Sequence, residues 1–104
     1  LRAFLQTHET KIEVVSHRVV HGGARFSAPC LLDAESERAI EALSPLAPLH
    51  NPRALRWIKT ARAVLGMGVL QIAVFDTAFY AHLPQVAATY ALPRELCEKH
   101  GIRR

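Results

Sequence analysis

The sequence is poor in the residues on which several classes of protein depend. It holds two cysteines, one methionine and one tryptophan in 104 residues, and aromatic side chains make up 7% of it. Cys30 and Cys97 stand far apart, outside any CxxC or metal-ligand spacing. This predicts two free thiols in a reducing cytoplasm and argues against a disulfide framework. With no helix-turn-helix or base-stacking signature, nucleic-acid binding is not expected.

Long apolar runs and phosphate-binding glycine motifs are also missing. The longest run, residues 69–75, is broken by Gln71 and is far too short to span a bilayer, which predicts a soluble protein without a membrane partner. Neither GxGxxG nor a P-loop occurs, and no nucleophilic triad is visible. The net charge of +4 is spread along the chain, which suits small anionic ligands.

What is present fits one small domain or part of one. Hydrophobic residues make up 50% of the chain, enough to bury a core. The chain begins at Leu1, residues 1–5 read as the tail of a helix, and the sequence stops soon after Gly101. We therefore expect residues 1–104 to be a single α/β piece of a longer protein.

Two stretches predict strands that are buried on both faces. Residues 12–21 are rich in Val and Ile and end in Gly22-Gly23, which predicts a tight turn, and residues 69–75 form the second strand. The second strand delivers Asp76 at its carboxyl end. Open α/β sheets bind their ligands at that edge.

Helices are expected between and after these strands, in the order β-α-α-β-α-α of an α/β fold. Asp33 is a suitable N-cap for the first, and Asn51 can cap the second, with Pro52 at its first helical position. Trp57 and Met67 are expected to be packing residues. The predicted helices span residues 31–43, 51–66, 84–90 and 93–100, with a loop at 77–83.

Arg18 is the first candidate functional side chain, because a buried strand does not take up a guanidinium without an anion. In an extended strand Arg18 and Val20 lie on one face about 7 Å apart. This arrangement would put a cation and an apolar wall at opposite ends of a small cavity, which suits a short carboxylic acid. Pairing of Arg18 with a local acid such as Glu13 or Asp33 is the alternative.

Three histidines need separate interpretations. His17 and His21 lie about 13 Å apart along a strand, too far to share one zinc ion, so each is expected to donate to a nearby carbonyl. His50 lies between two prolines ahead of a helix start, where amide donors and the helix dipole suit an anion. A surface loop histidine is the alternative for His50.

Asp76 allows several roles. It could orient a cation, hold a metal-bound water or move a proton, and a plain turn or helix cap is the alternative.

Three motifs, in order, resemble those of the acetate and butyrate kinase family. Residues 17–23 read H-R-V-V-H-G-G, residues 46–52 read L-A-P-L-H-N-P, and residues 75–79 read F-D-T-A-F. With Y-A-L-P at 90–93, the resemblance covers nearly the whole chain. It implies a fragment of the N-terminal ribonuclease H-like domain of the acetate and sugar kinase, Hsp70 and actin superfamily. It also implies ATP- and Mg²⁺-dependent phosphorylation of acetate, or a similar carboxylate such as propionate, to an acyl phosphate by a cytoplasmic homodimer.

The resemblance assigns roles to five residues. Arg18 would bind the substrate carboxylate or the phosphoryl group, Val20 and Leu49 would line the acyl pocket, and His50 would support the transferring phosphoryl. Asp76 matches the residue usually assigned as catalytic acid/base. Acetate, however, is already ionised at pH 7, so no proton has to be removed before it attacks. We expect Asp76 to orient Arg18 or a magnesium-bound water instead.

The sequence departs from the family pattern in two respects. Tyr80 stands where F-D-T-A-F is usually followed by His. The family's upstream phosphate segment, its F-H-G-T-S-H motif and its nucleotide domain are not among these residues, so no metal ligand is assigned and most ATP- and Mg²⁺-binding residues are expected elsewhere. The 104 residues alone are expected to be inactive. A non-catalytic α/β anion-binding or assembly module is the alternative function.

Overall fold

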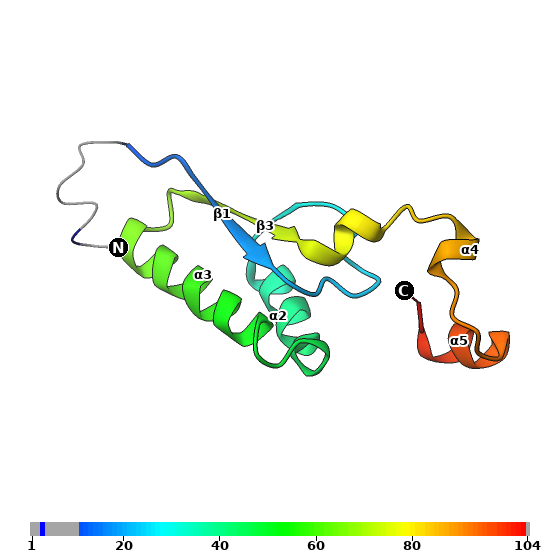
Figure 1. Cartoon of the computed structure of the whole chain (residues 1–104). Helices are drawn as coiled ribbons and strands as arrows, with labels where there is room; N and C mark the ends of the chain where they lie inside the picture. Colours follow the sequence, from blue (N-terminus) through cyan, green and yellow to red (C-terminus); the bar gives the residue numbers. More distant parts are fainter. Residues whose placement is uncertain (1–2, 4–10, 104) are drawn as a thin grey trace.

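A three-stranded sheet with helices against one face forms the body of the molecule, and the last two helices extend to one side (Figure 1). The computed structural model describes Ala3 and residues 11–103. Apart from Ala3, the expected helix tail at residues 1–5 lies outside the described residues. The molecule is elongated, with extents of 56 × 23 × 21 Å.

The sheet has the strand order β1-β3-β2. Strand β1 (Val14–Val19) runs parallel to β3 (Leu70–Phe75), and the two-residue strand β2 (Cys30–Leu31) pairs antiparallel with β3. The two long strands are confirmed in shorter form, whereas β2 is too short to show a periodic pattern. Because β1 and β3 are parallel, their carboxyl ends meet at one edge of the sheet, which brings Arg18 and Asp76 together.

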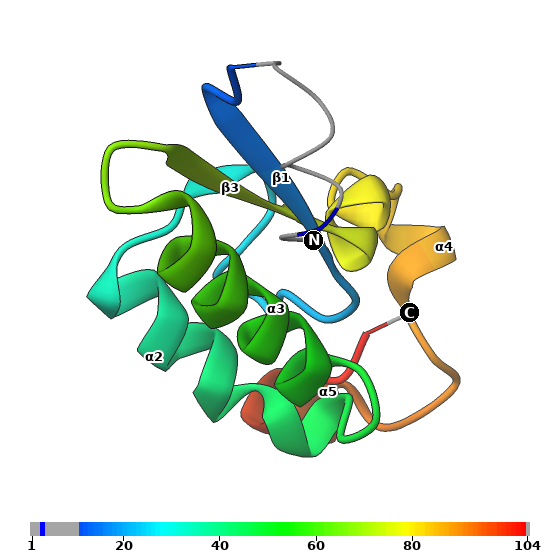
Figure 2. The ribbon, with the colours of Figure 1, turned by 90° about the vertical axis from the view of Figure 1, so that its left-hand side faces the viewer.

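The prediction that both strands are buried on both faces is wrong. Alternate side chains of β1 and β3 are buried, and those between them are exposed or half-buried, because the helices cover only one face (Figure 2). Val14, Leu70 and Val74 are exposed on the open face, and so is Arg18. The Arg18 side chain is therefore much more exposed to solvent than the sequence predicted.

The two helices of the body pack apolar side chains, Ile40 of one and Leu55 and Ile58 of the other, on the covered face. Helix α2 (Ala34–Ala42) is capped by Asp33, whose carboxylate accepts from the Ser36 amide at 2.7 Å while the Ser36 hydroxyl accepts from the Asp33 amide at 2.8 Å. Helix α2 begins later than expected because Leu31 belongs to β2. Helix α3 (Asn51–Leu65) follows a short 3₁₀ turn, η1 (Ser44–Leu46).

The core lies between α2, α3 and the sheet. Ile40 and Ile58 are fully buried and pack with Val19 and Phe75. By contrast, Trp57 is 62% exposed on α3 and Met67 is 82% exposed in the turn after it, so the prediction that both are packing residues is wrong. None of the helices in the described part of the chain has the length and apolar content needed to cross a membrane.

The double glycine after β1 forms the predicted tight turn. A Cβ on Gly22 would lie 2.8 Å from the Phe26 carbonyl oxygen and 2.9 Å from the Phe26 Cβ, and Gly23 has a φ of 60°. The Phe26 ring, in turn, stacks on Phe75 with ring centroids 4.5 Å apart. The absence of side chains at this turn lets the chain fold back against the end of β3.

The chain beyond β3 consists of short helices. A 3₁₀ helix, η2 (Asp76–Tyr80), occupies most of the predicted loop. Helices α4 (Gln85–Ala88) and α5 (Arg94–His100) are confirmed within the expected ranges, and α5 ends at Gly101, whose φ is 61°.

Candidate functional site

Arg18 and Asp76 form a bidentate ion pair at the carboxyl edge of the sheet. The Arg18 Nε atom donates to Asp76 Oδ1 at 2.9 Å and to Oδ2 at 3.1 Å, and Nη2 donates to Oδ2 at 2.7 Å. The Arg18 side chain is 79% exposed and that of Asp76 36%. The acid that pairs with Arg18 is thus neither Glu13 nor Asp33, but the aspartate at the end of the neighbouring strand.

This contact favours the charged form of both groups. Hydrogen bonding from Arg18 is the largest influence on Asp76 and holds the pKa of its carboxyl below the usual value, and the charges of Arg18 and His50 add to the effect while partial burial opposes it. The same bond raises the pKa of Arg18. Asp76 is therefore ionised at neutral pH, and its carboxylate fixes the plane of the guanidinium.

His50 stands at the start of α3, exposed and within electrostatic range of Asp76. It is the N-cap residue of the helix, and no side chain caps the first turn. The prediction that Asn51 caps α3 is wrong, because its amide is used elsewhere. Three segments therefore meet at this edge of the sheet: the end of β1, the start of α3 and the start of η2.

The two apolar candidates, Val20 and Leu49, differ in their exposure. Strand β1 ends at Val19, so the alternation that was expected to put Val20 on the same face as Arg18 does not extend to it. Val20 is half-buried, and Leu49, beside His50, is 74% exposed. An exposed leucine next to a cationic site is available to contact a small apolar group.

The other histidines have structural partners. His17 and Gln71 share a buried hydrogen bond of 2.7 Å between the His17 Nε2 and the Gln71 Oε1, as expected for a histidine donating to a carbonyl. The expectation that His21 also donates to a carbonyl is wrong, because its Nδ1 accepts from the Gly23 amide at 3.0 Å. Cys30 and Cys97 are free, as predicted, and burial raises the pKa of the Cys30 thiol.

Two residues that the sequence analysis did not select tie the site together. Asn51 is fully buried, and its amide donates to the His21 carbonyl at 2.9 Å and accepts from the His21 amide at 3.1 Å. Thr77 Oγ1 accepts from the Gly22 amide at 2.9 Å. The signal that could have found them is their position: each directly follows a predicted site residue within its motif.

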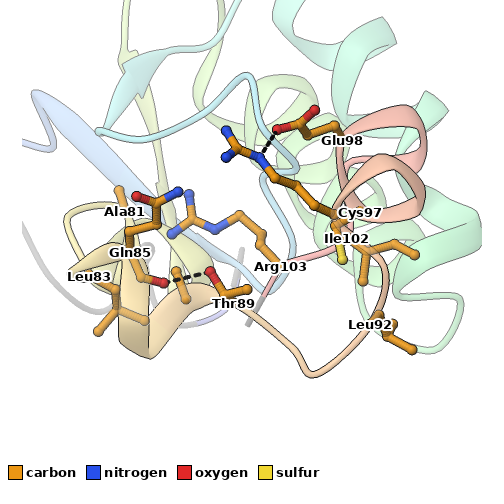
Figure 3. Close-up of a pocket in the computed structure, with 11 residues that line it drawn as sticks. Ala81, Leu83, Gln85, Thr89, Leu92, Cys97, Glu98, Ile102 and Arg103 are labelled. Atoms are coloured by element: carbon orange, nitrogen blue, oxygen red, sulfur yellow. Dashed lines mark hydrogen bonds and ion pairs between the residues drawn. The ribbon is translucent and has the colours of Figure 1, made fainter.

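Two cavities lie away from the ion pair. One of about 320 Å³ lies beside α4 and α5, where Leu83, Leu92 and Ile102 contribute apolar walls near Arg103 (Figure 3). The other, of about 560 Å³, is lined by His21, Thr77 and Tyr80 among others. Neither is lined by Arg18, His50 or Asp76.

Comparisons with known proteins agree on one group of relatives. A family model described as the Acetokinase family matches residues 2–104. Acetate kinase from Thermotoga petrophila is 55% identical over 94 residues, which make up 90% of this chain and 23% of that protein. Acetate kinase from Deinococcus deserti is 50% identical over the same share of each chain.

Solved structures agree as well. A propionate kinase from Francisella tularensis matches with a TM-score of 0.85 and 44% identity, covering 99% of this chain and 27% of that one. Acetate kinase from Porphyromonas gingivalis matches with a TM-score of 0.81 and 42% identity, covering 94% and 24%. These matches confirm the expected α/β fold class. The chain spans less than a third of the length of the relatives it matches.

Proposed function

The chain belongs to the acetokinase family, and from this premise we propose that the full-length protein transfers a phosphoryl group from ATP to a short-chain carboxylate such as acetate or propionate. The products would be ADP and an acyl phosphate. The observation that carries the proposal is the Arg18–Asp76 pair beside His50, three polar residues from three separate segments of the fold. Each lies in one of the motifs that resemble the family.

Arg18 has the donors that a carboxylate or a phosphoryl group requires. A guanidinium has five N–H bonds, and the Asp76 pair uses the single one on Nε and one of the two on Nη2. Both Nη1 hydrogens and one on Nη2 remain for an anion. Because the transition state of phosphoryl transfer spreads negative charge over the transferring oxygens, a fixed cation beside them lowers the barrier.

Asp76 acts in this proposal by orientation rather than by proton transfer. An acid whose pKa is held low by Arg18 has no proton to give at neutral pH, and a carboxylate substrate, already ionised, has none to lose. The carboxylate oxygen of the substrate then attacks the γ-phosphorus in line, the bond from phosphorus to the β,γ-bridging oxygen breaks, and ADP leaves with those electrons.

The remaining candidates have supporting roles. We assign His50 to the transferring phosphoryl group, which its exposed place at an uncapped helix start favours. Val20 and Leu49 would contact the acyl chain. Residues 1–104 would thus supply the acyl-substrate side of the N-terminal domain and would be inactive when separated from the rest.

Mg²⁺ does not fit a site made from the described residues alone. In the described ranges no group of three or more His, Cys, Asp or Glu side chains could hold a metal ion, and both Asp76 oxygens are bonded to Arg18. We therefore propose that metal binding, and most of nucleotide binding, involve parts of the full-length protein that this chain does not span.

Turnover of ATP by the full-length protein tests the proposal. ADP release would be measured with acetate, propionate and butyrate, each with Mg²⁺ present, and acyl phosphate would be trapped with hydroxylamine. We expect carboxylate-dependent turnover that Arg18→Ala reduces by about 100-fold or more. Absence of turnover with every carboxylate, in a folded protein, would contradict the proposal and favour a non-catalytic anion-binding module.

A further inference from the structure

The structure points to Asn51 and Thr77 as positioning residues for the reaction proposed above. We infer that they hold the segments bearing Arg18, His50 and Asp76 in register by binding two consecutive peptide groups of the turn after β1. The inference rests on the proposed function, because it concerns the alignment of that site. Neither residue needs to touch a substrate for this role.

Asn51 fixes the position of His50 relative to β1. Its side-chain oxygen accepts from the His21 N–H at 3.1 Å, and its NH₂ group donates to the His21 carbonyl at 2.9 Å. The side chain is fully buried. Rotating the amide by a half turn would set donor against donor and acceptor against acceptor, so only one orientation satisfies both bonds. An asparagine at a helix start ordinarily caps its own helix, yet here it reaches a segment 30 residues away.

Thr77 fixes the position of Asp76 relative to the same turn. Its hydroxyl oxygen accepts from the Gly22 amide at 2.9 Å, and this N–H belongs to the same peptide group as the His21 carbonyl that Asn51 binds. The Arg18–Asp76 pair then joins β1 to η2 a second time. Asn51 and Thr77 thus connect the segments that bear His50 and Asp76 to the short turn that follows the strand of Arg18.

Glycine at position 22 makes this close approach possible. A Cβ there would meet Phe26 at 2.9 Å and Phe75 at 3.0 Å, so any side chain at this position would collide with both. Loss of either hydrogen bond would allow the turn to move relative to α3 or η2. In-line phosphoryl transfer depends on alignment, and a displacement of about 1 Å costs on the order of 100-fold in rate.

A matched set of threonine variants in the full-length enzyme tests this. Thr77→Val preserves shape but removes the acceptor, Thr77→Ser retains it, and Thr60→Val removes an exposed hydroxyl on α3 that bonds only the Arg56 carbonyl. We expect Thr77→Val to lower kcat for the carboxylate by about 10-fold or more while KM changes by less than about threefold. Thr77→Ser should restore most of the lost kcat, and Thr60→Val should match the wild type.

Two further measurements separate positioning from folding. Hydrogen exchange of the amides in residues 20–26 should quicken in Thr77→Val but not in Thr77→Ser or Thr60→Val. Asn51→Asp, which keeps the acceptor for the His21 amide and loses the donor to its carbonyl, should also lower kcat. A Thr77→Val enzyme with lower stability but unchanged kcat would overturn the inference.

The outcomes also distinguish this inference from the function on which it rests. If the wild type turns over carboxylate, Arg18→Ala is inactive and Thr77→Val has normal kcat, the positioning role fails alone. If the wild type shows no carboxylate-dependent turnover, the proposed function fails and the positioning role fails with it.

Discussion

Replacing Asp76 with asparagine separates the two roles that its position allows. The side chain keeps its shape, but one carboxylate oxygen becomes an NH₂ group that cannot accept from a guanidinium. If the amide oxygen takes the place of Oδ2, the 2.7 Å bond from Nη2 and the 3.1 Å bond from Nε survive, but the 2.9 Å bond from Nε to Oδ1 is lost and the Nε–H faces the new NH₂ group. Arg18, whose side chain is 79% exposed, would then be held less firmly in its orientation.

The size of the effect follows from that loss of orientation. Removing one aligned transition-state donor costs about 100-fold to 1,000-fold in kcat, and a misaligned arginine still supplies its charge, so we expect a fall of about 100-fold. Because the carboxylate is already ionised in the wild type, the pH–rate profile should retain both of its limbs. Only its height should change.

The assay is steady-state turnover of the full-length enzyme from about pH 5.5 to 9, with both substrates saturating. Glu35→Gln is the matched control, because it also converts an exposed, arginine-paired carboxylate to an amide, at 2.6 Å from Arg25 and away from the site. Disappearance of an acidic limb in Asp76→Asn, with the limb intact in Glu35→Gln, would refute the orienting role and establish proton transfer.

Four further predictions concern stability and the turn. Gln71→Leu leaves the buried His17 ring without its partner and should lower the free energy of unfolding by about 1–3 kcal/mol in urea titrations, an effect that would be absent if water replaced the amide. Ile58→Ala should cost about 2–5 kcal/mol in the same titrations, since the side chain is fully buried; a loss under about 1 kcal/mol would place Ile58 outside the core. Gly22→Ala should reduce both the unfolding midpoint and kcat, because its methyl group would collide with Phe26 backbone, and an unchanged enzyme would contradict that packing. Because the pKa of Asp76 is lowered, its ionised form stabilises the fold at pH values above the ordinary carboxyl pKa near 4, and this stabilisation is lost as the pH falls through the lowered pKa. The free energy of unfolding of Asp76→Asn should therefore fall less steeply with pH in this range than that of the wild type.

The sequence predicted the parts of the fold that depend on local pattern. Asp33 caps α2 and Asp76 follows β3, because each follows from periodicity or a short-range motif. Burial of the strands was predicted wrongly because the covering of a sheet face depends on elements that no strand pattern encodes. The partner of Arg18 depended on strand register, which joins residues 58 positions apart.

The structure brings the predicted candidates Arg18, His50 and Asp76 to one edge of the sheet, but the hydrogen bonds that connect their segments were not predicted. Asn51 has the local signature of a helix cap, and its actual use depends on the turn after β1 lying within reach of α3. Thr77 has no distinguishing sequence feature apart from following Asp76. Local rules could identify the candidate side chains, whereas the hydrogen bonds that align them arise only from the tertiary arrangement.

The uncapped start of α3 sets a limit on engineering this protein. His50 occupies an N-cap position where Asp or Ser would stabilise the helix, and a stability-driven design would select such a substitution. An aspartate there would add a second negative charge within range of Asp76 and weaken the binding of the anion proposed for this site. A cap that stabilises the start of α3 would therefore act against the proposed function, and gains in stability are better sought on the exposed face of the same helix, at Trp57 or Thr60.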